Sequence, residues 1–491
     1  MLFYNLAFFV LFPFAIFAAR ARISWQVRKW ILVLLSYFVL FYTAWEPLFL
    51  VLVVGLTCID WTVGRKIAAA QTKSRRRVYL ICSLIVNLGL LGYFKYKGFL
   101  LENLSSLAHM IGLDLETSAS RVVLPIGISF YTFQSLSYTI DVYRGRAPCD
   151  SLVDYALFLA FFPRFVAGPI VRASQFLPQC EAPRTVDLET FFSGLSLIII
   201  GICGKLELAD RILGPVVDRV FGAALGNGVG FLNIWAGLLA YPCQIFFDFA
   251  GYSMAAIGAA RCLGFELPQN FNFPFAAQSI TEFWRRWHIS LSLWIRDYVY
   301  LPLTMWFAKQ TRRLPAGPSR NVLRPAGSFA AVVITMGLMG LWHGAMWTMV
   351  LYGVAHGVIL TIEAIRDRSR RTKQPEARPR TKVHAIAATY VIVSLSLVLF
   401  RTPRIQDALT IWHNAVSPGM LLSPDKLLPG LVLAAIVSGL TVTVHILGRN
   451  SNFESLWSRC HPFVRGVVLG LMLFFLSIYH GGGSEFIYAG F

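Results

Sequence analysis

Apolar runs long enough to cross a lipid bilayer recur along the whole chain, and they constrain its fold more than any other feature. Inside a membrane only α-helices and closed β-barrels satisfy every backbone hydrogen bond, and these runs lack the ten-residue alternation of barrel strands. Only 14% of the residues are charged, against about 25% in soluble domains. The sequence therefore predicts an all-α polytopic membrane protein, with apolar segments near 2–19, 30–45, 47–63, 78–94, 122–140, 155–170, 190–206, 230–250, 328–346, 347–364, 384–401, 427–447 and 464–480.

Some of these segments are too broken by proline and glycine to be simple spans. LPIGISFYTF (124–133) and FPRFVAGPI (162–170) are the clearest cases. Non-helical backbone at membrane depth persists only where protein or a water-filled cavity covers it. We therefore expect about ten to twelve true spans together with re-entrant or interfacial pieces.

Basic residues gather in short loops, which predicts the orientation of the chain. The net charge is +19, and the positive-inside rule assigns such loops to the cytoplasm. A nucleic-acid surface is the weaker interpretation, because the loops are short and carry no binding fold. The eight cysteines are scattered without a CxxC pair, so we expect no metal site. The basic loops are Arg20–Lys29, Arg65–Arg77, Lys309–Arg324 and Arg366–Lys382.

We predict a single integral membrane domain over residues 1–491. Its expected parts are N-terminal helices (1–120), a catalytic core (121–365), a cytoplasmic linker loop (366–382) and C-terminal helices (383–491). The first apolar run is followed, not preceded, by basic residues. We read it as an uncleaved first helix that begins outside the cytoplasm.

His343 is the strongest candidate for catalysis. It lies near the middle of residues 325–365, a length that suits a hairpin of two helices of about twenty residues each. We expect His343 deep in the bilayer or towards its outer side. A buried imidazole tends to stay neutral and can then take a proton from a hydroxyl nucleophile. GLWHG (340–344) and GVAHG (353–357) have the small-xxx-small spacing that permits close helix contact. The alternative is a packing histidine.

The segment Trp284–Asp297 carries a second histidine, His288. Its tryptophan-rich face opposite a cationic face is typical of a helix at the membrane interface. It could equally line a polar opening where arginine meets an anionic group; spacing alone leaves both readings open. If the segment is one helix, Trp284, Trp287, Leu291 and Trp294 form an apolar stripe and Arg285, His288, Ser292 and Arg296 a polar one.

Two further polar positions are interpreted as structural and not catalytic. Asp248 lies in an apolar helix with Gln244 and Tyr252 at four-residue spacing. A structural ion pair is the favoured interpretation of this carboxylate, with Arg164 as a candidate partner. We interpret His356 as a packing residue and not a catalytic one, since nothing else converges on it.

At these residues the chain resembles the membrane-bound O-acyltransferase (MBOAT) family. More closely, it resembles the bacterial branch that includes the membrane subunit of alginate O-acetylation and the teichoic-acid D-alanyl transferase. FWRRWHISLS followed by LWHG is highly specific for the family, and the likeness covers most of the chain. The stretches that match are LPIGISFYTFQSLSYTIDVYRG (124–145), FPRFVAGPIVR (162–172), YPCQIFFDFAGYSMAAIG (241–258), LGFELPQNFNFPFAAQSITEFWRRWHISLSLWIRDYVYLPL (263–303), GLWHGAMW (340–347) and, loosely, FIYAGF (486–491).

The resemblance implies a multi-helix fold around a transmembrane funnel, and acyl transfer. It makes His343 the match to the family's catalytic histidine and His288 the match to its second active-site histidine. We expect His288 to position the donor or to stabilise charge on the carbonyl oxygen. Trp284, Arg285, Arg286 and Ser292 are the expected donor-binding residues, the arginines through coenzyme A phosphates.

The resemblance further implies an inner-membrane enzyme of a bacterium. It would move acetyl from cytoplasmic acetyl-CoA to a periplasmic acetyltransferase or acceptor protein that modifies an exported polysaccharide. No permanently bound cofactor and no nucleic acid are expected. Two departures concern donor and partner identity. Relatives commonly read FSGYSDMAIG where this chain has Ala250 and Met254, and FIYFQF where it has Ala489 and Gly490.

The sequence leaves three alternatives open. A carrier protein could supply a D-alanyl or other acyl group in place of acetyl-CoA. The chain could transport a thioester or a polymer without transferase chemistry, although transporter-like repeats of broken helices are missing. It could also be a scaffold whose partner performs all the chemistry.

Overall fold

The computed structural model describes residues 6–44, 47–114, 124–125, 127–165, 168–225, 230–313, 315, 317–373, 382–417 and 428–478. It is 82% helical and has no strand among those residues, so the all-α prediction is confirmed. The chain divides into two compact units. Unit 1 comprises residues 1–202 and 252–268, and unit 2 comprises residues 203–251 and 269–491.

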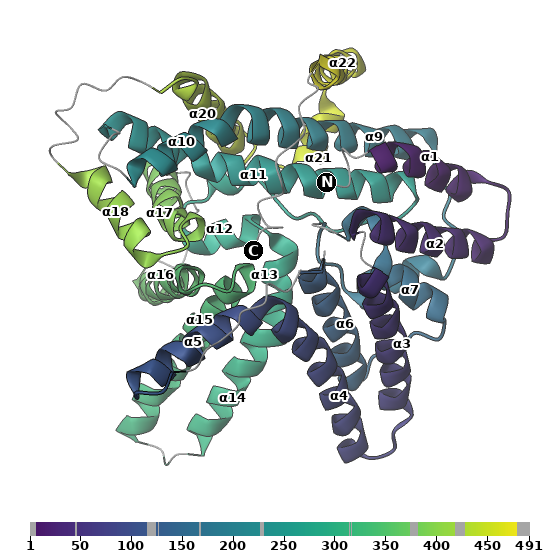
Figure 1. Cartoon of the computed structure of the whole chain (residues 1–491), viewed down its shortest axis with the longest axis horizontal. Coiled ribbons are helices and arrows are strands. Elements are labelled where there is room, and N and C mark those ends of the chain that lie inside the picture. The colour runs from purple at the N-terminus through teal and green to yellow at the C-terminus, as the bar shows by residue number, and fades with distance from the viewer. Residues whose placement is uncertain are drawn as a thin grey trace. The chain divides into compact units, whose positions relative to one another are not determined.

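Unit 1 holds the N-terminal helices. Helices α3, α4 and α6 pack side by side, and α2 packs on α7 (Figure 1). The helices of this unit are α1 (Leu6–Arg20), α2 (Trp25–Ala44), α3 (Pro47–Ala69), α4 (Lys73–Leu91), α5 (Lys97–Met110), α6 (Ile128–Tyr143), α7 (Leu152–Ala160), α8 (Ala173–Phe176) and α9 (Leu188–Cys203, whose last residue opens unit 2), with short η2 (Gly92–Tyr96), η3 (Phe162–Arg164) and η4 (Leu177–Cys180).

A buried polar cluster joins three helices of unit 1. The Asp60 carboxylate on α3 accepts hydrogen bonds from Ser83 Oγ (2.6 Å), Asn87 Nδ2 (2.9 Å) and the Ser135 hydroxyl. These donors come from α4 and α6. Such a cluster persists in an apolar core only when its groups find partners, so it fixes the mutual register of the three helices.

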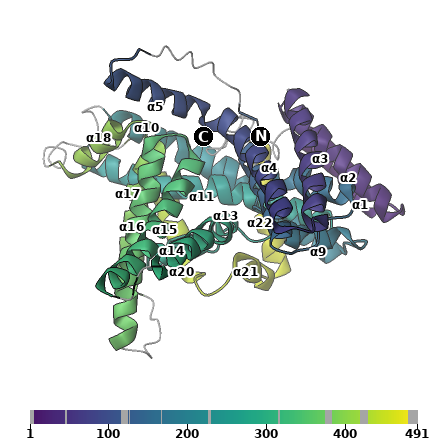
Figure 2. The same cartoon turned by 90° about the horizontal axis from the view of Figure 1, so that it is seen from below.

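Unit 2 carries the histidines of interest. Helices α14, α15 and α16 group together in both views (Figures 1 and 2). The helices are α10 (Gly214–Ala224), α12 (Ile280–Arg286), α13 (Ile289–Ile295), α14 (Leu301–Arg312), α15 (Pro318–His343), α16 (Trp347–Lys373), α17 (Val383–Arg401), α18 (Ile405–Val416), α20 (Leu431–Leu447), α21 (Phe453–Arg459) and α22 (Pro462–Ile478), with η5 (Gly204–Leu213), η6 (Pro274–Ala276) and η7 (Arg296–Tyr300); α11 (Phe231–Cys262) belongs to both units.

The helical hairpin predicted around His343 is present as α15 and α16. Its two helices meet at glycines: a Cβ on Gly340 would lie 2.1 Å from the Met349 carbonyl oxygen, and one on Gly353 would lie 2.0 Å from that of Met336. Only a residue without a side chain fits at that separation. The two GxxxG-type motifs thus bring the helices into the close contact that the sequence predicts.

The number of spans differs from the prediction. Six described helices are long and apolar enough to cross a membrane, or seven if the bent pair α21–α22 is one span. The expectation of ten to twelve is therefore too high for the described residues. Some apolar runs form helices that are too short, as for Val10–Arg20 and Leu431–Leu447. The segment 162–170, which was expected to be broken, begins with the short 3-10 helix η3 (Phe162–Arg164).

The predicted linker and C-terminal motif lie mostly outside the described residues. Helix α16 continues through Lys373, so the first part of the 366–382 segment is helical. Residues 374–381 and the FIYAGF motif (486–491) are not among those the structure describes.

Asp248 forms a buried structural ion pair. In unit 2 its carboxylate forms an ion pair with Lys205, which also bonds Asp210 Oδ1 at 2.8 Å. The predicted structural ion pair is therefore confirmed, but its partner is Lys205 and not the candidate Arg164. The three side chains are at most 7% exposed, so the lysine offsets the cost of burying two carboxylates. Sequence spacing could not identify this pairing, because Lys205 lies on the separate helix η5.

Candidate active site

His343 is the last residue of α15 and lies buried inside unit 2. Its ring is 3% exposed and packs against Trp342 and Phe400, at centroid distances of 4.9 and 5.5 Å. It lines a cavity of about 10 Å³, enough for about one water molecule. Trp284, Trp287 and Phe400 line the same cavity, which is mostly aromatic. A small group that reaches His343 would thus find a site with little water.

His288 lies in a break between two helices, not within one. Helix α12 ends at Arg286 and α13 begins at Ile289, with His288 in the left-handed region at φ 42°. Residues 284–297 are therefore not one helix, and the two stripes expected for a continuous helix do not form. A non-glycine residue in this conformation costs of order 1 kcal/mol or more and persists where its surroundings hold it. Here the backbone N–H of Ile289 donates to the Asn270 carbonyl (2.9 Å).

Asn270 fixes the hydrogen-bonding state of His288. Its Oδ1 lies 3.1 Å from His288 Nδ1, 2.9 Å from Ser290 Oγ and 3.3 Å from Ser290 N. A backbone N–H can only donate, so the amide atom facing it must be the oxygen. That oxygen can only accept from Nδ1, so Nδ1 of His288 carries the proton. In the neutral ring Nε2 then has the lone pair, and it has no hydrogen-bond partner among the described residues.

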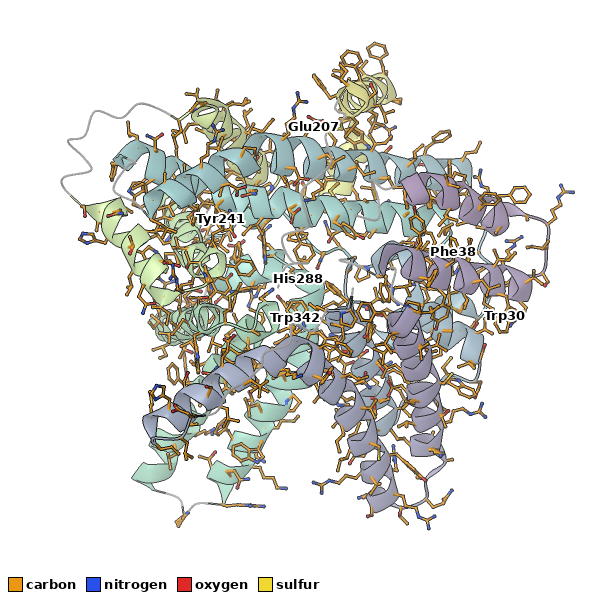
Figure 3. The ribbon with its side chains drawn as sticks, in the orientation of Figure 1. Trp30, Phe38, Glu207, Tyr241, His288 and Trp342 are labelled. Carbon is orange, nitrogen blue, oxygen red and sulfur yellow. The ribbon has the colours of Figure 1, made fainter. Side chains whose placement is uncertain are left out.

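The surroundings keep His288 neutral. Burial lowers the pKa of its imidazole well below the usual value, and the nearby His343 lowers it further. Figure 3 shows His288 beside Trp342, whose ring centroid lies 6.2 Å from that of His288 and 4.9 Å from that of His343. The structure thus brings together the two histidines that the sequence singled out. Their mutual repulsion disfavours charge on both at once.

The other predicted site residues are more scattered. The Trp284 indole lines the cavity beside His343. Arg286 is tied into an ion pair with Glu282 at 3.0 Å, and Arg285 is exposed. Ser292 is half-buried on α13, and its hydroxyl donates to the Trp287 carbonyl (3.5 Å). Their part in donor binding stays a prediction.

The tryptophans of this segment do not behave as membrane anchors. The side chains of Trp284, Trp287 and Trp294 are 4–8% exposed and are covered by protein. An interfacial anchoring helix would present them to lipid. The interfacial reading is therefore wrong for this face.

His356 is a packing residue, as the sequence favoured. Its Nδ1 accepts the Trp284 indole N–H at 3.2 Å, and its Nε2 lies 3.0 Å from Ser396 Oγ. Because Nδ1 accepts, Nε2 carries the proton and donates. Both ring nitrogens are thus occupied, and His356 holds Trp284 against the cavity. Among the described residues no three His, Cys, Asp or Glu side chains converge as metal ligands would.

Asn270 is a residue of the candidate site that the sequence analysis did not single out. It lies in the quoted run 263–303, yet no charge or helical period distinguishes it. Its role depends on a contact eighteen residues along the chain. The sequence does not show that the His288 backbone adopts the left-handed conformation. It therefore could not identify Asn270 as the residue that supports this conformation.

Comparison with known proteins gives a consistent picture. The sequence model of the MBOAT, membrane-bound O-acyltransferase family matches residues 150–400. A probable alginate O-acetylase of Azotobacter vinelandii is 38% identical over 78% of this chain and 71% of its own length. A peptidoglycan O-acetyltransferase of Helicobacter pylori is 32% identical (78% and 73%). A teichoic acid D-alanyltransferase of Bacillus subtilis is 30% identical (56% and 68%).

Proposed function

The chain belongs to the membrane-bound O-acyltransferase family and is an O-acyltransferase, and we propose that it moves acetyl from cytoplasmic acetyl-CoA for the O-acetylation of an exported polysaccharide. The observation that carries the catalytic part is the pair of buried histidines around Trp342. The acetyl group and the polysaccharide are supported by the names of two relatives, an alginate O-acetylase and a peptidoglycan O-acetyltransferase.

His343 acts as the general base. Its imidazole takes the proton from the acceptor hydroxyl while the oxygen attacks the thioester carbonyl carbon. The carbon–sulfur bond then breaks, and the thiolate leaves with the electron pair and receives the proton from His343. The products are an acetyl ester and free coenzyme A, so atoms and charge balance. The aromatic cavity keeps water from competing with the hydroxyl.

His288 acts as a hydrogen-bond acceptor. Because Nδ1 donates to Asn270, the neutral ring presents a lone pair at Nε2. That atom can orient a hydroxyl or amide donor of the substrate. Stabilising an oxyanion through Nε2 would need a protonated ring, which burial opposes. Of the two roles expected for His288, positioning is the one that this geometry supports.

We place the enzyme in the inner membrane of a bacterium, working with a periplasmic partner. The multi-pass character supports membrane residence. The basic loops support a cytoplasmic donor side, where Arg285 would be available to coenzyme A phosphates. The polysaccharide-modifying relatives support an acceptor outside the cell.

A second candidate is transfer of a D-alanyl or another acyl group from a carrier protein. The similarity to teichoic acid D-alanyltransferase favours it, although over a smaller part of the chain. Such an enzyme would use the same histidines and ignore free acetyl-CoA.

The test is thioester cleavage in proteoliposomes with radiolabelled acetyl-CoA. Wild type is compared with His343→Ala and with His461→Ala, an exposed histidine before α22 that serves as the matched control. Cleavage by wild type and the control, with loss in a stable His343→Ala variant, supports the proposal. Activity only with a carrier-bound acyl group supports the second candidate. Full activity in His343→Ala would refute the catalytic assignment.

A further inference from the structure

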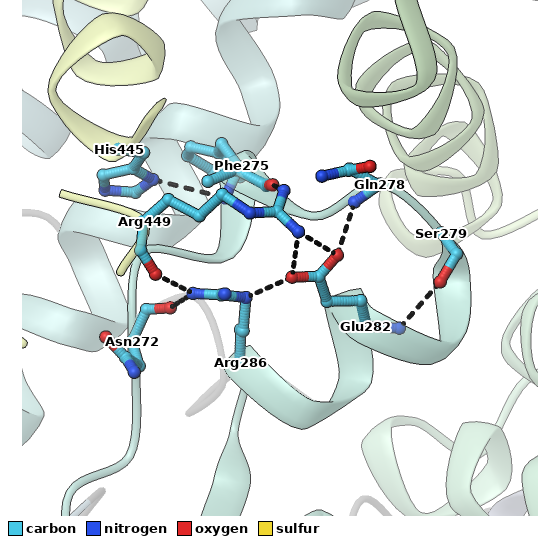
Figure 4. A network of polar contacts seen from close by, with 9 residues as sticks. Asn272, Phe275, Gln278, Ser279, Glu282, Arg286, His445 and Arg449 are labelled. Carbon is cyan, nitrogen blue, oxygen red and sulfur yellow. Dashed lines mark hydrogen bonds and ion pairs between the residues drawn. The ribbon is translucent and has the colours of Figure 1, made fainter. Parts of the chain in front are cut away.

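The end of α20 holds the loop that supports His288, and Arg449 is the centre of that contact (Figure 4). Arg449 lies outside residues 150–400, the part that the family model matches. We propose that Arg449 is a positioning residue for His288, so that the C-terminal helices complete the active site. The inference rests on the proposed function only in taking His288 to act in acyl transfer.

The Arg449 guanidinium clamps two separate elements. Its Nη2 donates to both carboxylate oxygens of Glu282, at 2.8 and 2.9 Å, and its Nη1 donates to the Ala276 carbonyl. The Arg449 and Glu282 side chains are only 13% and 22% exposed, so this charge-assisted pair is partly shielded from water. A lysine, with one nitrogen, reproduces at most part of this fork.

Glu282 passes the restraint on to Arg286, two residues before His288. The Glu282 carboxylate accepts from Arg286 Nε (3.0 Å) and from the backbone N–H of Gln278 (2.9 Å). Arg286 Nη1 in turn donates to the carbonyls of Asn272 and Arg449, both at 3.1 Å. The two arginines and one glutamate therefore tie the 272–278 loop to the end of α12.

The same end of α20 meets the loop at two further points. The backbone N–H of Phe275 donates to His445 Nδ1 (3.3 Å). A Cβ on Gly448 would lie 2.6 Å from the Phe273 ring, so a glycine is needed for this approach. Phe273 is itself in the left-handed region at φ 48°. The loop is thus held in a strained shape from Phe273 to Ala276.

This loop is the same one that fixes His288. Asn272 N–H donates to the Arg286 carbonyl (2.9 Å), and Asn270 holds the His288 ring and the backbone after it. Two strained residues persist only while their surroundings hold them. Removal of the clamp would let the turn relax and shift the imidazole. A shift of about 1 Å at a catalytic group can cost about 10²-fold in rate.

The kinetic test uses a double-mutant cycle. We expect Arg449→Ala to lower kcat by about 10²-fold with little change in KM for the donor, and Arg449→Lys to restore part of it. Arg459→Ala, an exposed arginine on α21, is the matched control and should behave as wild type. In a His288→Ala background Arg449→Ala should have no further effect. Equal losses in both backgrounds would overturn the proposal, because they indicate general destabilisation.

A second readout needs no acyl donor. In ¹⁵N-histidine-labelled protein, NMR assigns the His288 signals by their loss in His288→Ala. Wild type should show the neutral Nδ1–H tautomer, and Arg449→Ala or Arg449→Lys should show a shifted or mixed tautomer. If wild type fails to cleave acetyl-CoA yet the tautomer responds, the proposed function fails and the positioning role stands. Unchanged His288 signals in both Arg449 variants would overturn the role of Arg449.

Discussion

Replacing Asn270 with alanine is the sharpest test of how the fold prepares His288. The Asn270 side-chain oxygen accepts from His288 Nδ1, Ser290 N and Ser290 Oγ, all in a buried site. Alanine removes that acceptor, so that two buried donors, His288 Nδ1–H and Ser290 N–H, lose the hydrogen bond that they make to it. Each such donor costs about 1–3 kcal/mol, so we expect Asn270→Ala to destabilise the protein by roughly 2–6 kcal/mol.

The effect on catalysis should exceed the effect on folding at the assay temperature. Without the acceptor the His288 proton is free to move to Nε2, and the lone pair that faces the substrate is then lost. We expect kcat to fall by about 10²-fold, measured as thioester cleavage at a temperature where both proteins remain folded. Thermal unfolding in detergent, followed by tryptophan fluorescence, checks that condition.

The variant Asn270→Asp distinguishes the hydrogen bonds that residue 270 accepts from its effect on the protonation of His288. A carboxylate still accepts from Nδ1 and Ser290, so most of the stability should return. Its charge favours the protonated imidazole and raises the pKa of His288, so activity should be recovered mainly at higher pH. The reasoning is refuted if Asn270→Ala has the wild-type kcat and His288 remains the Nδ1–H tautomer.

Three further predictions concern unit 2. Gly353→Ala should separate α15 from α16 and lower both the unfolding temperature and the activity. Gly344→Ala should be tolerated, because a Cβ at Gly344 would meet only methionine side chains, at 3.1 Å or more. Equal unfolding temperatures of the two variants would contradict this. Lys205→Met should cost about 3–5 kcal/mol, because it removes the cation that the buried Asp210 and Asp248 carboxylates share. Asp248→Asn with Asp210→Asn in the same chain should restore stability. The pKa of His288 is lowered in the folded state, so its ring stays neutral there while the unfolded chain takes a proton. The free energy of unfolding should therefore fall as pH drops below about 6.5. His288→Gln should flatten this pH dependence in thermal unfolding, and an equal slope in the variant would argue against a buried neutral ring.

The sequence by itself determined the membrane class, the helical hairpin around His343 and its close packing. These follow from local patterns. Run length reports whether a segment can span a bilayer, and a glycine at every fourth position reports a narrow helix contact wherever it occurs. The residue spacing from Trp284 to Asp297 is also a local pattern. It gave the wrong faces here, because helical periodicity describes side-chain positions only when the helix is continuous. At the break, His288 and Ile289 bond Asn270, which lies in the segment before α12.

Only the tertiary structure decided which groups act on one another. Asp248 bonds Lys205 and not Arg164 because η5 brings a lysine to the carboxylate. The tautomer of His288 depends on Asn270, and the shape of that loop depends on Arg449, 163 residues from Arg286 along the chain. Contacts of this kind are set by packing between distant segments. A buried charge or a strained residue persists only where such a contact stabilises it, and no local period in the sequence records that contact.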